Sequence, residues 1–270
     1  MRRRGGTLRR RALAAALGAA AACCLLGAPA AAVTNRAGDV LASFDGAISP
    51  TTLPRSEPAP VAVSVAGDLR SASDDAEALP QLRRITVAIN RQGRLDDRGL
   101  PVCQPSQIQP ASEVQARRIC GSALVGRGSV DVEVRIASQL PFEVHAQLLA
   151  FNGPLRDGHR LILAHVYAGQ PPGSFTLPFR VSRRPGTFGT VLSATLPPRA
   201  RGWAYLTHFQ MTLHRTFSYR GSRRSYIAAA CSAPEGFRSA LFPFAKATYS
   251  FRGAPALSMS VAKECRVKNQ

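Results

Sequence analysis

Apolar and polar residues alternate with a period of two along much of this 270-residue chain, and this pattern limits its fold more than any other property. In residues 130–136, valine and isoleucine alternate with Asp131, Glu133 and Arg135. Successive side chains of a β-strand point to opposite faces, so this segment is predicted to be a strand with one buried face. Similar stretches predict further strands at 61–66, 84–90, 141–151, 160–168, 175–181, 189–196 and 245–251.

The longest alternating stretch runs from Trp203 to Tyr219, and we interpret it as one strand. The residues that follow, Arg220-Gly221-Ser222-Arg223, have the composition of a turn. Residues 225–231 then return as the partner strand, so the sequence predicts a β-hairpin in this region.

Helix signals are few. Residues 112–119 are expected to form two or three helical turns with Ser112 as the N-cap. Many short strands, together with 20 prolines and 22 glycines, predict an all-β fold. We expect an antiparallel two-layer β-sandwich with one short helix, formed by residues 61–270 as a single domain. Residues 33–60 are expected to form an extended, proline-rich N-terminal segment before it.

The first 32 residues have the composition of a signal peptide. Six arginines precede an uncharged, alanine-rich run from Ala12 to Ala32, and we predict cleavage after Ala32. The alternatives are an uncleaved anchor, because the run of 21 residues is long enough to span a bilayer, and a lipoprotein attached through Cys23. Either the general or the twin-arginine export route is compatible with the arginines. We expect an extracellular or cell-envelope protein with no transmembrane segment after cleavage.

Four cysteines remain after residue 32, and an even number in an exported chain indicates disulfides rather than metal ligands. Of the three pairings, we favour Cys103–Cys120 and Cys231–Cys265, because each pair brackets a compact local segment. Loop closure predicts that these bonds stabilise the fold by about 3 and about 4 kcal/mol respectively. A cysteine–histidine nucleophilic site is the alternative, but a thiolate in an oxidising compartment is prone to oxidation.

Several short phrases of the sequence resemble those of a known group of proteins. They are Phe44-Asp45-Gly46, Gly99-Leu100-Pro101-Val102-Cys103, Cys120-Gly121-Ser122 and Cys231-Ser232-Ala233-Pro234. Together these phrases resemble a group of exported, β-rich proteins of soil actinobacteria that has no assigned activity. The likeness covers most of the chain after residue 32. It implies secretion and a disulfide-braced β-rich body, and it transfers no site residues.

The chain is strongly basic and has a long stretch without any carboxylate. Six of its 35 Lys and Arg residues and none of its 16 acidic residues lie in residues 1–32, so the remainder carries a net charge of +13. No acidic residue occurs between Asp157 and Glu235. Four arginines of this stretch lie at or near the tip of the predicted hairpin: Arg215, Arg220, Arg223 and Arg224.

Guanidinium groups match the geometry of phosphate and carboxylate, so these four arginines are our candidate polyanion-binding site. The expected partner is an anionic cell-wall polymer or an anionic lipid surface; specific nucleic-acid recognition is not expected of an exported protein. The alternative is that the arginines reflect genome composition, because only three lysines, Lys246, Lys263 and Lys268, occur in the whole chain.

No linear motif of catalysis, cofactor binding or metal binding is present: there is no Gly-x-Ser-x-Gly, phosphate-binding glycine loop or His-Glu-x-x-His. His208 and His214 share a face of the predicted long strand, but six residues of strand separate them by about 20 Å, too far to share a metal ion. We therefore predict a non-enzymatic binding or structural protein without a cofactor. The alternative is a secreted hydrolase whose site gathers His145, His165 or His208 with a carboxylate from a distant strand.

Overall fold

The structure is a computed structural model that describes residues 32–73, 79–136, 139–197 and 203–268. The predicted leader, apart from Ala32, lies outside the described residues. Strands account for 62% of the described residues and helices for 7%, as the alternating sequence predicts. None of the helices in the described ranges has the length and apolar character needed to span a bilayer.

The described elements follow the chain from Val33 to Val267. The strands are β1 (Val33–Ala37), β2 (Val40–Ser49), β3 (Thr52–Leu53), β4 (Ala59–Pro60), β5 (Ala62–Ser71), β6 (Leu82–Ile89), β7 (Gly93–Leu95), β8 (Leu124–Val134), β9 (Phe142–Arg156), β10 (His159–Gly169), β11 (Pro172–Arg183), β12 (Thr190–Thr195), β13 (Ala204–Leu213), β14 (Thr216–Tyr219), β15 (Ser222–Ser225), β16 (Ile227–Ala229), β17 (Ser239–Phe251) and β18 (Leu257–Val267). The helices are α1 (Pro105–Ile108), α2 (Glu113–Cys120) and a short 3-10 helix (Gly121–Ala123).

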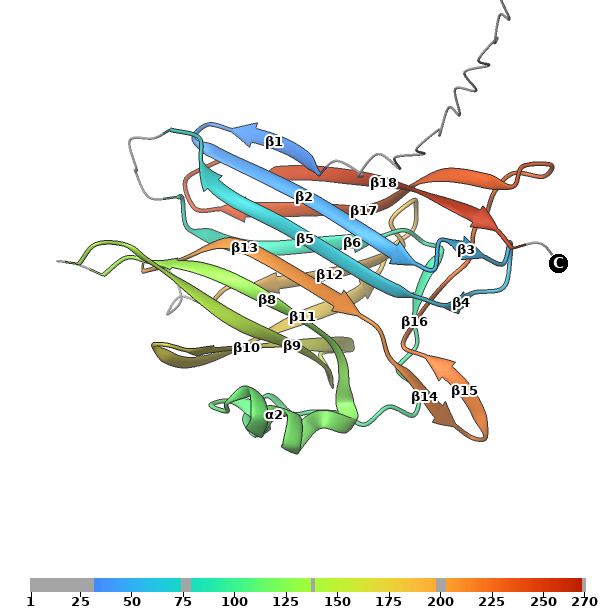
Figure 1. Ribbon diagram of the computed structural model, residues 1–270, viewed down its shortest axis with the longest axis horizontal. Coiled ribbons are helices and arrows are strands. Elements are labelled where there is room, and N and C mark those ends of the chain that lie inside the picture. The colour runs from blue at the N-terminus through green and yellow to red at the C-terminus, as the bar shows by residue number, and fades with distance from the viewer. Residues whose placement is uncertain (1–31, 74–78, 137–138, 198–202, 269–270) are drawn as a thin grey trace, which may run out of the picture. The chain divides into compact units, whose positions relative to one another are not determined.

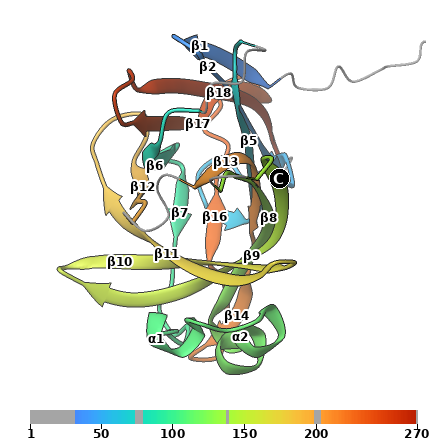
Figure 2. The same ribbon diagram turned by 90° about the vertical axis from the view of Figure 1, so that its left-hand side faces the viewer.

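Thirteen of the strands form one sheet in the order β1-β2-β5-β13-β8-β9-β10-β11-β12-β6-β17-β18-β3. The neighbours are antiparallel, except that β3 runs parallel to β18. The sheet curls, so that β17 and β18 lie opposite β9, β10 and β11 (Figures 1 and 2). The all-β, antiparallel prediction is confirmed, but its two layers are opposite sides of one curled sheet rather than two separate sheets.

The two ends of the curled sheet are joined by side chains. The Asn35 amide of β1 donates to the carbonyl oxygen of Ser258 in β18 over 3.2 Å. The Lys263 ammonium of β18 lies 2.9 Å from the Asp45 carboxylate of β2. These two contacts fasten the first strands of the chain to the last ones, which brings residues more than 200 positions apart into one core.

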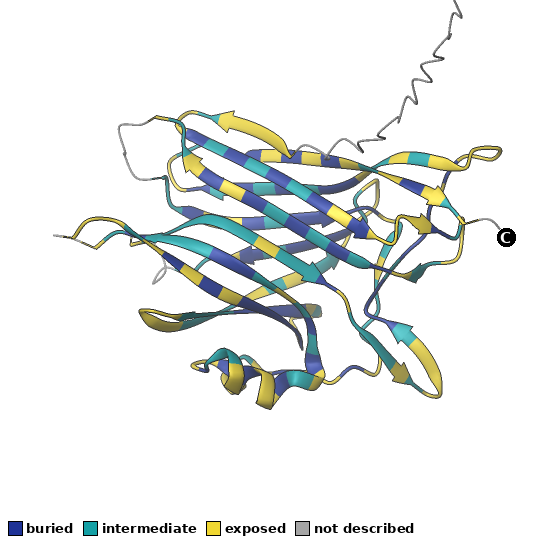
Figure 3. Cartoon of the chain, viewed as in Figure 1, coloured by how far each residue is buried: buried dark blue, intermediate teal, exposed yellow. Residues whose placement is uncertain are grey.

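The alternation of the sequence appears in the structure as alternating burial along several strands, among them β2, β5 and β18 (Figure 3). In β2, for example, every second residue from Val40 to Ile48 is buried and those between are more exposed. Phe44 of β2 and Tyr249 of β17 are fully buried in the same apolar cluster, which fills the space between the opposite sides of the sheet. Removing such apolar surface from water is the main force that holds the curl closed.

Strand β9 departs from this pattern because both of its faces are covered. Its residues 148–153 are all buried. One face looks into the curl, and α1 and α2 pack on the other, around Phe151 and the disulfide between Cys103 and Cys120. Ser112 caps α2 by accepting a hydrogen bond from the backbone of Gln115, as expected from the sequence.

A buried histidine fastens this helical segment to the sheet. The His165 side chain of β10 is fully buried, and its Nε2 lies 3.0 Å from the carbonyl oxygen of Ala111. Since a carbonyl only accepts, Nε2 carries the proton, and Nδ1 accepts from the Thr176 hydroxyl over 3.1 Å. Burial lowers the pKa of His165, so the neutral imidazole is favoured.

The structure differs from the sequence-based expectations in two places. Residues 33–60 do not form a separate extended segment, because β1 and β2 belong to the main sheet and Phe44 lies in its core. The predicted single strand over 203–219 is divided, since β13 ends at Leu213 and β14 begins at Thr216. The chain leaves the main sheet there, and β14 forms a hairpin with β15, with Arg220-Gly221 at the turn. The predicted partner strand over residues 225–231 is wrong, because β16 in this segment pairs with β4 and β7 instead.

Both favoured disulfides are present. The Cα atoms of Cys103 and Cys120 are 5.5 Å apart, and those of Cys231 and Cys265 are 5.7 Å apart. The first bond joins the helical segment to the loop before it, and the second joins the segment after β16 to β18.

Candidate functional site: an arginine cleft

A cleft of about 1040 Å³ opens at the end of the curled sheet where β6 and β11 end and β10 and β12 begin. The small sheet β4-β16-β7 forms one wall; β4 and β16 lie at the right in Figure 1, and β7 and β16 lie at the centre of the view in Figure 2. The hairpin β14–β15 contributes a second wall. We call this the arginine cleft, because eight arginines line it: Arg91, Arg94, Arg98, Arg160, Arg183, Arg184, Arg223 and Arg224.

The cleft carries a large surplus of positive charge. Its eight guanidinium groups face only two carboxylates, Asp96 and Asp97, which leaves a net charge of +6 from these lining residues. Its volume lies in the upper range of small-molecule binding sites. A concave surface with one sign of charge focuses its field and raises the local concentration of counter-ions.

The loop before Leu100 positions the hairpin against the cleft. The Asp96 backbone N–H donates to the carbonyl oxygen of Tyr226 over 2.9 Å. Gly99 has a φ of +86°, and a Cβ at this position would lie 2.1 Å from the ring of Tyr219. Glycine is therefore required twice at this residue, for its backbone angle and for the close approach of the Tyr219 ring. This contact holds β14–β15 where β15 lines the cleft.

Asp96 orients two of the arginines. Its two carboxylate oxygens accept a fork of hydrogen bonds from Arg98, each 2.9 Å long, and one oxygen also accepts from Arg224 over 2.9 Å. The hydrogen bonds from Arg98 are the largest cause that lowers the pKa of Asp96, to about 2. Asp96 is therefore ionised at neutral pH and holds both guanidinium groups in fixed positions.

Asp97 pairs with Arg160 on the opposite wall of the cleft. The other five arginines of the cleft have no carboxylate within 4.0 Å among the described residues: Arg91, Arg94, Arg183, Arg184 and Arg223. All five are exposed. Their donors are directed to solvent, where a ligand with several phosphate or carboxylate groups can accept from them.

The floor of the cleft is rigid and uncharged. Tyr226 is buried, and this burial strongly raises the pKa of its hydroxyl. Asn152 is also buried, and its side-chain amide donates to the carbonyl oxygen of Pro101 over 3.0 Å. The arrangement supplies many cationic donors above an uncharged floor, which is suited to binding an anion.

The structure brings two of the four predicted arginines into this cleft, Arg223 and Arg224. Arg220 lies at the hairpin turn, with its guanidinium 5.3 Å from the centre of the Tyr219 ring. Arg215 lies outside the cleft lining, and its Nε is buried without a hydrogen-bond partner.

Sequence reasoning placed the candidate site at the hairpin and missed the other six arginines of the cleft. Arg160, Arg183 and Arg184 lie between Asp157 and Glu235, where no acidic residue occurs. This local excess of positive charge was the signal in the sequence that could have identified them. Arg91, Arg94 and Arg98 lie in a different part of the chain. The pairing of β6 with β12 brings Arg91 to the cleft, and the pairing of β7 with β16 brings Arg94 and the loop after it.

A second group of polar side chains lies toward the other ends of the strands. Cross-strand neighbours on β2, β5, β13, β8 and β9 bring together Ser43, Asp68, His208, Asp131 and His145, which we call the polar row. The Ser43 hydroxyl donates to Asp68 over 2.5 Å, and His208 Nδ1 lies 2.7 Å from the same carboxylate. His145 Nδ1 contacts Asp131.

The polar row does not provide a nucleophile and its base. Burial would raise the pKa of Asp68, but hydrogen bonds from Ser43 and His208 outweigh it and lower that pKa. The Ser43 hydroxyl donates to the Asp68 carboxylate and not to an imidazole, and the lowered pKa of Asp68 makes this carboxylate a weak base. His165, the third histidine of the hydrolase alternative, is buried beneath the helices. His214 is exposed beyond the end of β13.

Within the described residues, no three His, Cys, Asp or Glu side chains are arranged to hold a metal ion. Comparison with protein-family models, curated proteins and solved structures found no match. The chemistry of the cleft is therefore the main indication of function.

Proposed function

We propose that this chain is an exported, non-enzymatic binding protein of the cell envelope or its surroundings, and that it holds an anionic cell-wall polymer in the arginine cleft. The observation that carries the proposal is the surplus of guanidinium groups in the cleft, five of which have no carboxylate partner among the described residues. Arginines scattered by genome composition alone have no reason to converge on one concave surface from four strands and the turns beside them.

The form of the site favours a polymer chain over a flat lipid surface. The arginines line the walls of a concavity, so a strand of polymer can contact several of them at once. A planar bilayer would reach only the rim. The two disulfides and the leader predicted from residues 1–32 support a location outside the cytoplasm, where anionic wall polymers occur.

The proposal is tested by titrating the purified protein with a fluorescent poly(glycerol phosphate). Counter-ion release predicts that the affinity falls steeply, by about 100-fold or more, between about 50 and about 200 mM salt. The cleft variant is the triple substitution Arg94→Ser, Arg183→Ser and Arg223→Ser. It removes three exposed guanidinium groups and breaks none of the observed ion pairs. We expect it to bind about 100-fold more weakly at low salt.

The matched control is the triple substitution Arg83→Ser, Arg118→Ser and Arg252→Ser, which removes the same charge from exposed positions outside the cleft. We expect it to change the affinity by less than about threefold, since distant surface charges are screened. Equal losses in the two triple variants would overturn the proposal. So would tighter binding to anionic lipid vesicles than to the polymer, with no difference between the two variants.

A further inference from the structure

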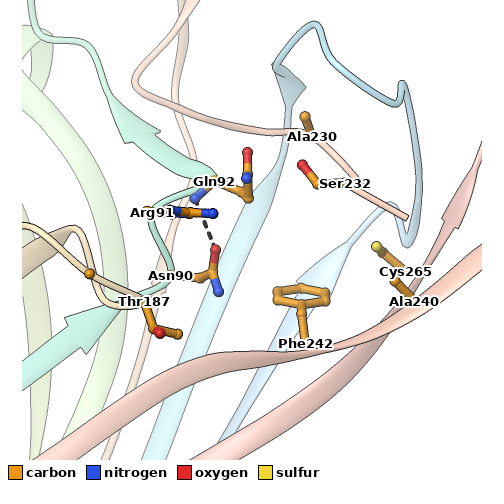
Figure 4. Close-up of a pocket in the computed structure, with 10 residues that line it drawn as sticks. Asn90, Arg91, Gln92, Thr187, Ala230, Ser232, Ala240, Phe242 and Cys265 are labelled. Carbon is orange, nitrogen blue, oxygen red and sulfur yellow. Dashed lines mark hydrogen bonds between the residues drawn. The ribbon is translucent and has the colours of Figure 1, made fainter. Parts of the chain in front are cut away.

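A second, smaller pocket of about 330 Å³ adjoins the arginine cleft (Figure 4). The ring of Phe242 lies on one side of this pocket, and the side chains of Gln92 and Ser232 lie on the other (Figure 4). Asn90 is held in place, because its amide donates to the carbonyl oxygen of Pro243 over 2.7 Å and its oxygen accepts from the Gln92 backbone over 2.9 Å. Arg91 is the only ionisable side chain in the lining, since Cys265 is in a disulfide.

Arg91 belongs to the lining of both the pocket and the cleft. Its position is fixed by the contact between two turns. The Arg91 backbone N–H donates to the carbonyl oxygen of Thr187 over 2.9 Å. A Cβ on Gly189 would lie 2.9 Å from the Cα of Arg91, so the two turns can pack this closely only with glycine there. The pocket and the cleft therefore form two parts of one continuous surface, with Arg91 at their boundary.

The chemistry of the pocket differs from that of the cleft. It combines an aromatic ring with uncharged amide and hydroxyl groups, contributed by Gln92, Thr187 and Ser232. A sugar ring presents an apolar C–H face and a rim of hydroxyl groups. The ring of Phe242 can stack on the C–H face of the sugar, and the amide and hydroxyl groups of the pocket can hydrogen-bond to the sugar hydroxyls. A phosphate chain without sugars offers neither of these features.

We propose that this pocket seats a sugar ring of an anionic glycan, while the charged groups of the same chain lie in the arginine cleft. The inference rests on the proposed function and adds a ligand class: a polymer that carries both sugar rings and anionic groups. The cleft supplies affinity through charge, and the pocket supplies selection for the glycan.

The test compares two polyanions, dextran sulfate, which has sugar rings, and inorganic polyphosphate, which has none. The main variant is Ser232→Phe, which fills the pocket from an exposed position and leaves Phe242 in its packing. We expect it to weaken binding of dextran sulfate about tenfold and to change binding of polyphosphate by less than about twofold. Phe242→Leu, which removes the ring but keeps an apolar side chain against Phe244, is expected to act in the same direction.

The controls are Ser239→Phe and Leu241→Ala, two exposed positions outside the pocket, which are expected to leave both affinities unchanged. Thermal unfolding of each variant checks that the fold is retained. If the wild type binds both polymers and Ser232→Phe weakens neither, or weakens both equally, the sugar pocket is overturned and the polyanion function stands. If the wild type binds neither polymer, the proposed function itself fails.

Discussion

The arginine cleft and the polar row both collect charged side chains from several strands, but they differ in how those charges are balanced. In the polar row each histidine lies beside a carboxylate, Asp68 for His208 and Asp131 for His145. In the cleft, eight guanidinium groups share two carboxylates. Charged residues are abundant in both regions, and only an excess of one sign leaves donors for a ligand.

The difference follows from where the residues lie on the strands. The polar row lies within paired strands, where the register places each side chain opposite a neighbour on the next strand. The cleft arginines lie in turns, in the short strands β7 and β15, and at the ends of β10 and β11. Where they are paired across strands, their partners carry no charge: Ala228, Leu155, Val181, Thr190, Ser218 and Phe217. A network of cross-strand pairs stabilises the sheet, whereas the ends of the strands are available for binding.

The largest effect is expected from removing the disulfide at the cleft end of the sheet. The substitutions Cys231→Ala and Cys265→Ala should lower the free energy of unfolding by about 4 kcal/mol, because the bond closes a loop of 34 residues. Urea unfolding measures this change. Hydrogen exchange should accelerate first in residues 227–240, beside the pocket, and later in β5 and β13, which carry the polar row. Uniform acceleration would show that the two regions do not differ in local stability.

A smaller effect is expected from Gly99→Ala, which disturbs the wall of the cleft and not the polar row. The new Cβ would have to displace the Tyr219 ring, and the alanine backbone would have to keep a positive φ. We therefore expect a loss of about 2 kcal/mol in unfolding free energy and weaker polymer binding. The control is Gly221→Ala, which also has a positive φ of 74° but open space around it, and should cost about 1 kcal/mol. Equal costs would mean that the contact with Tyr219 does not position the hairpin.

Removing one carboxylate from each region should have different consequences for binding. Asp96→Asn releases Arg98 and Arg224, so the affinity for poly(glycerol phosphate) should rise about threefold while stability falls by about 1 kcal/mol. Because Asp96 has a pKa lowered to about 2, its stabilising contribution is complete above its ordinary value of 3.8 and is lost as the pH falls toward 2. Asp68→Asn in the polar row should also reduce stability and leave the affinity unchanged. Weaker binding by the Asp96 variant would argue against the cleft.

The smallest effect concerns a histidine that has no carboxylate beside it, in contrast to those of the polar row. Burial lowers the pKa of His165 in the folded protein, so the unfolded chain takes up a proton first as the pH falls below about 6.5. The stability that His165 contributes is complete above that pH and decreases on acidification. His165→Gln should therefore reduce the difference in unfolding free energy between about pH 7.5 and about pH 5. If the unfolding free energy of His165→Gln differs between these two pH values as much as that of the wild type, His165 is not the source of this pH dependence.

Much of the local structure follows from the sequence. The alternation around Asp131 predicts β8, Ser112 predicts the start of α2, and the spacing of the cysteines predicts both disulfides. These features depend on neighbouring residues only. The strand containing Phe44 was missed, although its apolar residues alternate, because the proline-rich stretch after it suggested an extended segment.

The candidate site is less accessible to such reasoning. Arg223 and Arg224 were found from the local excess of arginine, but Arg91 joins them only through the pairing of β6 with β12, and Arg94 through the pairing of β7 with β16. These pairings link segments about 100 residues apart or more and leave no periodic signal in the sequence. For the polar row, the sequence suggested only that His145 or His208 could meet a distant carboxylate. It did not identify Asp68, Asp131 or Ser43, since these residues are neighbours only after five strands have taken their register.

The central claim is that the cleft arginines are the binding surface, and arginine footprinting tests it most directly. The protein is treated with phenylglyoxal with and without poly(glycerol phosphate), and the modified peptides are quantified by mass spectrometry. We expect the polymer to protect Arg91, Arg94, Arg183 and Arg223, and to leave the exposed Arg83 and Arg252 as reactive as before. Equal protection of all exposed arginines, or none in the cleft while the polymer is bound, would contradict the account.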